Sequence, residues 1–517
     1  MEEGQFVSIG PDISIDEDDP MEESFVSVSA NMSSEEVRQF FIEDAPRDDH
    51  LTMSYSFLSR LNNNHHIMNR DSYSFWMDLF LACFNGDIEN VKLALTENRN
   101  GFNQEDSTGI TPFYMACLNR HINVVKLLLS DKRIDINKAD SNGTTPLSLV
   151  CQKNNIEIVK LLLSDERIDI NKADILNSTP LYLSCYLGHV EIVKLLLNDV
   201  RILKNKPNNY GETPFFIACS QGQIEVVKLL VNDKESQVLL DMENEFGKIK
   251  LLINNQRVFL NKSNQDGRTP FFIACEKGHF EVVKLLLDNK RVKINKADDN
   301  GTTPFHVACQ KGRIEIVKLL LKCDKVVEIN NENKDGRTPL FIACTMGHLE
   351  IVRLLLDDRK SIITQEKKSQ LLATACQNVH LGVVKLLLNH EGIDINHQLM
   401  YNSITTLYFA CAFGHIEVVK HILAFERGSV STNKRENTKN ALNISRGRSK
   451  SIRKFDWETE EHFQIAKENC PKIVKLLESF QRNSNETKLK LRKEVKYCIL
   501  FFSFSFHSFL KKKKINR

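Results

Sequence analysis

Cysteine and histidine recur along this chain at spacings that could serve metal binding, disulfide formation or catalysis. Ten of the thirteen cysteines occupy one place in a repeat of about 34 residues: Cys83, Cys117, Cys151, Cys185, Cys219, Cys275, Cys309, Cys344, Cys376 and Cys411. Six of the fifteen histidines share a second place: His121, His189, His279, His348, His380 and His415. No CxxC pair, phosphate-binding glycine loop or Gly-x-Ser-x-Gly motif accompanies them. We therefore expect no catalytic, cofactor-binding or metal-binding residue, and no enzyme.

Periodic placement favours packing, because a ligand cluster would bring different repeat positions together. A cysteine at one helical position of every unit acts as a small buried hydrophobe. The histidines fall at a turn between helices, and pairs such as Glu157 and Lys160 lie three residues apart on the next helix. Reduced thiols in this number are typical of the cytoplasm, with the nucleus as an alternative.

The repeat itself predicts paired helices. Units open with a Thr-Pro pair at residues 111, 145, 179, 213, 269, 303 and 338. In the unit 142–174, Thr145 has N-cap chemistry and Pro146 fits the first helical position. A second helix over 156–163 carries a broad apolar stripe, and the extended segment 167–171 follows it. A period of this length indicates stacked units that share one continuous core.

These units resemble the ankyrin repeat. The family pattern is matched by Gly301-Thr302-Thr303-Pro304-Phe305-His306-Val307-Ala308-Cys309, Gly312 and Ile316-Val317-Lys318-Leu319-Leu320-Leu321. Most units run 34 residues, with Arg-Ile-Asp-Ile-Asn in place of the family's Gly-Ala-Asp-Val-Asn segment. The resemblance implies an all-α ankyrin-repeat solenoid with a hairpin-like finger in each repeat. It also implies that binding specificity lies on the concave face, in the finger tips and the solvent side of the first helices.

The pattern divides the chain into five segments. We expect an acidic, mostly disordered segment at 1–73, about ten repeats at 74–425, a basic linker at 426–454, a degenerate capping repeat at 455–482 and a basic, apolar tail at 483–517. Between Thr213 and Thr269 lie 56 residues, which is one period plus 22. We interpret the excess as a repeat truncated near 240–265, and expect a bend or weaker stacking there.

Charge and hydropathy limit the partners. The formal net charge of +2 gives no global attraction to nucleic acid. Residues 1–50 hold fifteen Asp or Glu against two Lys or Arg, and the start of the chain lacks a signal-peptide pattern. The apolar run 498–510 is too short to span a bilayer. It leaves open a peripheral membrane anchor or a gene-model artefact, although we do not expect a membrane partner.

Apolar residues where polar ones are expected single out a candidate binding surface. Most units carry polar pairs after the repeat cysteine and at the finger tip. The exceptions are Ile175, Leu176, Tyr186, Leu187 and Tyr210, with Met346 and Phe413 as a second patch. The alternative is that these side chains fold over their neighbours. Aromatic residues stand three positions after most of the repeat threonines, and they are interpreted as packing between repeats.

The sequence therefore predicts a non-catalytic, monomeric scaffold or adaptor that binds a protein partner on the concave face and needs no cofactor. Two alternatives remain open. The chain could be a membrane-peripheral scaffold anchored by its C-terminal tail, or the regulatory subunit of a partner enzyme.

Overall fold

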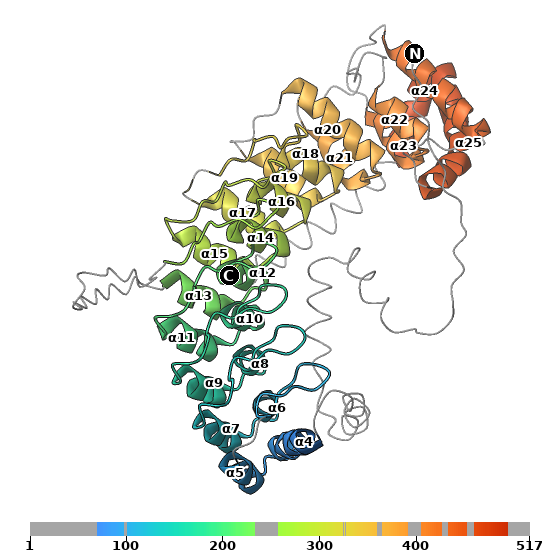
Figure 1. Ribbon diagram of the computed structural model, residues 1–517. Helices are drawn as coiled ribbons and strands as arrows, with labels where there is room; N and C mark the ends of the chain where they lie inside the picture. Colours follow the sequence, from blue (N-terminus) through green and yellow to red (C-terminus); the bar gives the residue numbers. More distant parts are fainter. Residues whose placement is uncertain are drawn as a thin grey trace, which may run out of the picture.

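Pairs of helices stacked in two layers make up the described part of the protein (Figure 1). A computed structural model describes residues 70–97, 101–232, 257–323, 325, 327–358, 364–390, 405–425, 433–451 and 460–494. The first layer contains α4 (Arg70–Asn85), α6 (Pro112–Leu118), α8 (Pro146–Gln152), α10 (Pro180–Leu187), α12 (Pro214–Ser220), α14 (Pro270–Lys277), α16 (Pro304–Gln310), α18 (Pro339–Thr345), α20 (Gln365–Gln377), α22 (Thr406–Ala412) and α24 (Asn433–Lys450). The second contains α5 (Ile88–Thr96), α7 (Ile122–Leu129), α9 (Ile156–Leu163), α11 (Val190–Asn198), α13 (Ile224–Asn232), α15 (Phe280–Asp288), α17 (Ile314–Lys322), α19 (Leu349–Asp357), α21 (Leu381–Asn389), α23 (Ile416–Phe425) and α25 (Glu460–Arg482).

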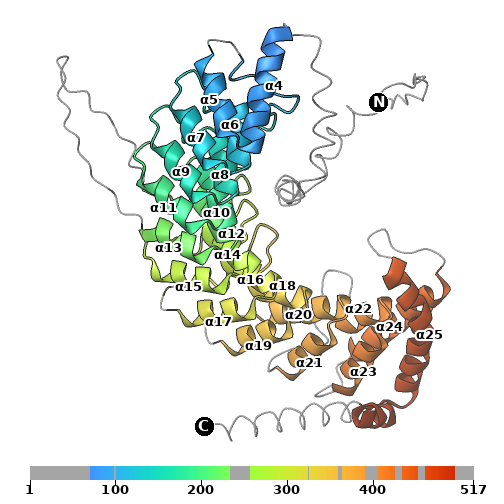
Figure 2. The same ribbon diagram turned by 90° about the horizontal axis from the view of Figure 1, so that it is seen from below.

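Each helix packs against the equivalent helix of the neighbouring repeats as well as against its own partner. The stack follows a curve, with the first-layer helices on its inner side and the second-layer helices on its outer side (Figure 2). The described residues contain no strand. The all-α solenoid that the sequence predicts is confirmed.

The Thr-Pro pairs begin the first-layer helices. Thr145 accepts a hydrogen bond from the Ser148 N–H, and Pro146 occupies the first turn, where its missing N–H leaves no bond unmade. The same cap recurs at Thr111, Thr179, Thr213, Thr269, Thr303 and Thr338. The start of each helix is thereby fixed, and residues such as Leu147 face the core.

The ten repeat cysteines are packing residues. All are buried thiols outside any disulfide. Burial raises the pKa of the Cys151 thiol to about 12, although a hydrogen bond with Ser184 acts in the opposite direction. Because the thiolate is the reactive form, these cysteines are held in their inert state.

The repeat histidines join each repeat to the preceding one. The ring nitrogen Nε2 of His189 lies 3.0 Å from the Gln152 carbonyl oxygen, at the end of the preceding first-layer helix. The same contact recurs at His121, His279, His348 and His380. Gln223 and Arg313 make it in repeats that lack the histidine. This shared geometry supports the interpretation of the repeat histidines as packing residues for five of the six.

Side chains hold the segment that follows five of the second-layer helices, α5, α7, α9, α11 and α13. Asn171 donates from Nδ2 to the Arg201 carbonyl and accepts from the Leu203 N–H, both at 2.8 Å. Asn103, Asn137, Asn205 and Asn261 repeat this reciprocal pair. We name these five residues the asparagine ladder. Each rung satisfies one donor and one acceptor of the next repeat's backbone, as a β-bridge would.

The arginine of the same segment caps the preceding repeat. Asp165 accepts from Nε and Nη2 of Arg167, and Nη2 also donates to the carbonyl of Leu129, the last residue of α7, at 2.8 Å. Arg133 and Arg201 repeat the arrangement. The last carbonyls of a helix lack partners within the helix, and the guanidinium supplies them. The Arg-Ile-Asp-Ile-Asn segment therefore keeps the repeats connected.

The stack is continuous where the sequence predicts a truncated repeat. α12 packs against α14, and α13 against α15, as in the other neighbouring pairs. Val258 and Leu260 are buried in the finger of the next repeat, and the His279 Nε2 lies 2.8 Å from the Ser220 carbonyl oxygen. The expectation of a bend or weaker stacking is therefore wrong. The extra chain lies within the connection between α13 and this finger, and residues 233–256 lie outside the described part.

Helix α24 corrects the prediction of a linker at 426–454. It packs against α22 and α25, and buries Ala441, Leu442 and Ser445. The Nε of buried Arg448 donates to the Ala412 carbonyl at 3.2 Å, which replaces the histidine contact of the other repeats. α24 and α25 thus form the last helix pair, and a further helix follows at 484–494. Residues 1–69 and 495–517, which include most of the predicted N-terminal segment and the Phe-rich tail, lie outside the described residues.

Candidate protein-binding surface

The finger tips are tight turns fixed by Asp or Asn side chains. Asp140 Oδ1 accepts from the backbone N–H groups of Asn142 and Thr144, at 3.0 and 2.7 Å. The same pair of bonds forms at Asp174, Asn208, Asn264, Asp298 and Asn333. A backbone bond then joins neighbouring tips, as from the Ile175 N–H to the Asn142 carbonyl at 3.1 Å. The Asp and Asn side chains at the tips therefore hold a firm surface.

The aromatic row at the base of the fingers is buried from Tyr114 to His306 and half-buried at Phe341 and Tyr408. The Tyr182 hydroxyl donates to Glu212 Oε2 at 3.0 Å, and Asn208 Nδ2 donates to the same oxygen at 3.1 Å. The Tyr114 hydroxyl donates to Asp140 in the next finger, and burial together with this carboxylate raises the pKa of Tyr114. In these repeats the tyrosine joins the first helix to the finger of the next repeat. This is the packing between repeats that the sequence predicts.

His306 occupies this row and makes stability sensitive to pH. It is fully buried, with Nε2 3.1 Å from the Arg337 carbonyl oxygen and Asp298 nearby. Burial lowers the pKa of His306 below its ordinary value of 6.5. The unfolded chain therefore binds a proton at His306 more readily than the folded chain does. The contribution of neutral His306 to the free energy of unfolding is present above about pH 6.5 and is lost as the pH falls below it.

A His306→Phe variant should reduce this loss. Phenylalanine fills the same place at Phe216 and Phe272 in other repeats, so it fits the site. We expect the urea midpoint of the parent to fall between about pH 7.5 and about pH 5 by more than that of the variant, because the variant has no proton to gain. Equal falls would show that His306 does not contribute to the pH dependence.

A groove of about 280 Å³ lies on the inner side of the repeats that contain α14, α16 and α18. Its finger side is lined by Arg268, Asp298, Asn300, Thr302, Asn333, Asp335 and Arg337. Its helix side is lined by Phe272, Glu276, Val307, Gln310, Ile342, Thr345 and Met346. We name this the finger groove, because it separates the finger tips from the C-terminal ends of the first-layer helices.

Opposite charges are paired along the finger groove, across it for Arg268 and Glu276 and on its finger side for Arg337 and Asp335. Arg268 Nη1 lies 3.6 Å from Glu276 Oε2, and the guanidinium carbon lies 5.9 Å from the centroid of the Phe272 ring. Arg337 Nη1 lies 3.9 Å from Asp335 Oδ2. Pairs at these distances and this exposure contribute about 0–1 kcal/mol each to stability. The groove is therefore polar, with no dominant charge.

Four of the five predicted residues at 175–210 occupy repeat positions that line the finger groove further along. The fifth, Ile175, takes the place of Asp299 and Lys334, which are not among the described residues that line it. Ile175 is 56% exposed, while Leu176 and Tyr210 on adjacent tips are half-buried. Tyr186 and Leu187 are half-buried at the C-terminal end of α10, and Tyr186 also packs against the core. By counting from the repeat cysteine, Tyr186 takes the place of Glu276, and Leu187 that of Met346. We name these five the apolar patch.

The second predicted patch does not form as expected. Met346 is 45% exposed and lines the finger groove. Phe413 is only 3% exposed, and its ring stacks on His415 with centroids 5.8 Å apart. The prediction of Phe413 as an exposed residue is wrong because α24, which the sequence pattern does not mark as part of a repeat, packs over α22.

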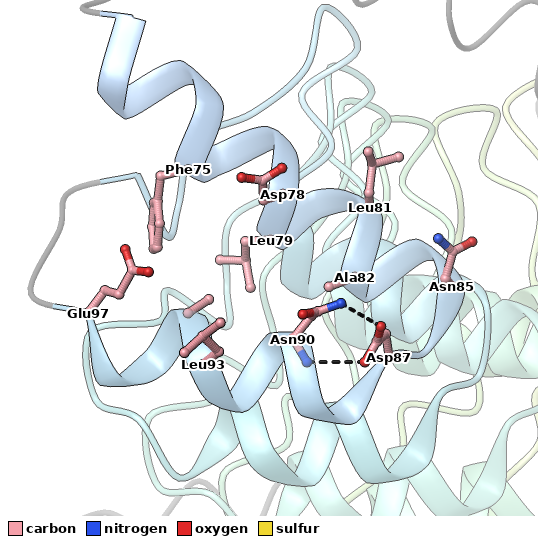
Figure 3. A pocket seen from close by; sticks show the side chains of 11 residues that line it. Phe75, Asp78, Leu79, Leu81, Ala82, Asn85, Asp87, Asn90, Leu93 and Glu97 are labelled. Carbon is pink, nitrogen blue, oxygen red and sulfur yellow. Dashed lines mark hydrogen bonds between the residues drawn. The ribbon is translucent and has the colours of Figure 1, made fainter.

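A second pocket, of about 330 Å³, lies between α4 and α5 at the N-terminal end of the described stack. Figure 3 shows Leu79 and Ala82 of α4 opposite Leu93 of α5, with the acidic residues Asp78, Asp87 and Glu97 around them. Leu93 is 60% exposed and Leu81, which also lines the pocket, is 37% exposed. We name this the end pocket.

Nowhere in the described ranges do three His, Cys, Asp or Glu side chains gather in a geometry that could hold a metal ion. The helices of that part also include none with the length and apolar character needed to cross a bilayer.

Helix pairs stacked in two layers, with a finger before each pair, define a repeat solenoid. The chain belongs to the ankyrin repeat family: a family model of ankyrin repeats (3 copies) matches residues 79–174, 168–241, 242–331, 323–399 and 372–454. No curated protein matches the chain. Arrays of ankyrin repeats are protein–protein interaction modules, and this chain is such a module.

Proposed function

We propose that this protein is a non-catalytic scaffold or adaptor, and that the apolar patch on its concave face binds a protein partner. The observation that carries the proposal is Ile175, which is 56% exposed on a finger tip. The corresponding position on five other tips is polar and exposed: Ser141, Asn209, Gln265, Asp299 and Lys334. An apolar anchor surrounded by polar neighbours is the usual arrangement of a binding hot spot.

The fixed geometry of the tips supports this function. Asp174 Oδ1 accepts from the N–H groups of Leu176 and Ser178, and the Asn209 N–H donates to the Leu176 carbonyl at 2.9 Å. The tip that carries Ile175 is therefore ordered before a partner arrives. Binding to an ordered surface loses less conformational entropy, and more of the contact energy appears as affinity.

The proposal includes the compartment and the oligomeric state. Buried thiols in ten repeats are compatible with the reducing cytoplasm or nucleus. A single copy carries the whole apolar patch, so a monomer is sufficient for binding.

Ile175→Asp should weaken partner binding at least tenfold, because a charge would have to be buried at the anchor. The matched control is Val200→Asp: Val200 is 58% exposed and follows α11 in the outer layer. Proximity labelling with the full-length chain would compare the two variants with the parent. A third variant, combining Tyr186→Ala, Leu187→Ala and Tyr210→Ala, tests the rest of the patch. If both patch variants label the same partners as strongly as Val200→Asp, binding on this patch is excluded.

A further inference from the structure

The end pocket lacks the cover that the equivalent surface has in the next repeat. Leu81 is 37% exposed, whereas Met115, at the same repeat position, is 3% exposed. Met115 is covered by Trp76 and Phe80 of α4, which lie four residues apart on the preceding helix. Leu93, on the other side of the pocket, is 60% exposed. A cover for this pocket therefore needs apolar side chains at helical spacing, as α4 provides for α6.

The rim of the end pocket is acidic. Asp78, Asp87 and Glu97 line it, and none of the described residues that line it is a lysine or arginine. Both carboxylate oxygens of Asp87 accept hydrogen bonds from Asn90, which fixes one side of the rim. An apolar segment that carries a positive charge complements this surface better than an acidic one.

The chain directly before α4 has this composition. Residues 51–69 contain no Asp or Glu and one arginine, Arg60. Met53, Phe57 and Leu61 recur every four residues, which would place them on one face of a helix. Residues 1–50, with fifteen acidic residues against two basic ones, would be repelled by the same rim.

The connection is long enough for the segment to reach the pocket. α4 runs from Arg70 to Asn85, and the pocket begins at Phe75. At 1.5 Å per residue the helix is about 24 Å long. The nine residues from Leu61 to Arg70 span up to about 30 Å when extended. The connection is therefore long enough for residues 53–61 to run back along α4 and reach the end pocket of the same molecule.

We propose that residues 53–61 dock in the end pocket of the same chain. Phe57 and Leu61 cover Leu81 and Leu93, and Arg60 lies at the acidic rim. The segment thus supplies the missing neighbour of the first repeat. The proposal is independent of the apolar patch, which lies several repeats away.

Trypsin cleavage after Arg60 in the full-length chain tests this docking. In the parent we expect cleavage after Arg60 to be at least tenfold slower than after Arg38, which lies in the acidic segment. Leu93→Asp should remove this difference. The matched control is Leu489→Asp: Leu489 is 59% exposed at the opposite end of the stack, and this variant should keep the protection. Circular dichroism would confirm that both variants retain their helices.

Variants with reversed charges provide a second test, which is read out by amide hydrogen exchange of residues 51–69. Arg60→Glu and Asp78→Arg should each speed exchange several-fold, and the combined variant should restore protection. Cleavage after Arg60 as fast as after Arg38 in the parent, or protection that survives Leu93→Asp, would overturn the proposal. Protection that disappears on dilution would also overturn it, because the pocket would then be covered by a second copy.

Discussion

Leu181→Ala is expected to lower the free energy of unfolding by about 2–5 kcal/mol. Leu181 is fully buried on α10, which packs between α8 and α12. Truncation removes apolar contacts and leaves a cavity, because the two neighbouring helices hold the surrounding side chains in place. Urea unfolding followed by circular dichroism at 222 nm measures the effect.

The matched control for Leu181→Ala is Val200→Ala. Val200 is 58% exposed, so its truncation should change the free energy of unfolding by less than about 0.5 kcal/mol. Amide exchange adds a spatial test, since repeats interact only with their neighbours. Protection should fall mainly over α8, α10 and α12. Equal free energies for the two variants would contradict the packing described for the core.

Gly347→Ala is expected to cost about 2–4 kcal/mol, the second largest effect. Gly347 has φ of +74°, and an added Cβ would overlap the ring of His380. That ring lies against the Thr345 carbonyl, with Nε2 at 2.8 Å from the oxygen. The substitution therefore combines backbone strain with loss of an inter-repeat contact. Thermal and urea unfolding would measure the loss.

Gly336→Ala separates these two contributions. Gly336 has φ of +72°, yet the nearest atom to an added Cβ is a Glu332 carboxylate oxygen at 3.9 Å. The backbone strain is thus the same, about 1–2 kcal/mol, without the steric overlap. We expect Gly347→Ala to be the more destabilising variant by at least about 1 kcal/mol. If the two costs agree, the His380 contact does not contribute to stability.

Periodicity allowed most of the helical architecture to be predicted. Thr145 and Pro146 signal a helix start through their own chemistry, and Cys151 reports burial because it recurs in step with the helices. The asparagine ladder shows a further periodic signal, but the partners of Asn171, for example, lie 30 and 32 residues away. A sequence pattern does not indicate which backbone groups a side chain reaches across that distance.

The errors arose where a repeat lacks its usual residues. α24 begins without a Thr-Pro pair, and buried Arg448 replaces the histidine contact, so the segment has the composition of a solvated linker. Phe413 was consequently predicted on an exposed surface. Between α13 and α14, the period alone does not distinguish a truncated repeat from added chain in a connection. The contact between His279 and Ser220 makes that distinction.

The asparagine ladder also identifies a place where foreign sequence could be grafted. Asn205 reaches Arg257 and Phe259 across 52 and 54 residues of chain, whereas Asn171 closes the same pair across 30 and 32. Asn205 and Asn171 each make both hydrogen bonds of the ladder. Each doubling of a loop costs only about 0.6 kcal/mol in closure entropy. A reporter peptide or small folded domain spliced between Asn232 and Arg257 should therefore leave the joints between repeats intact.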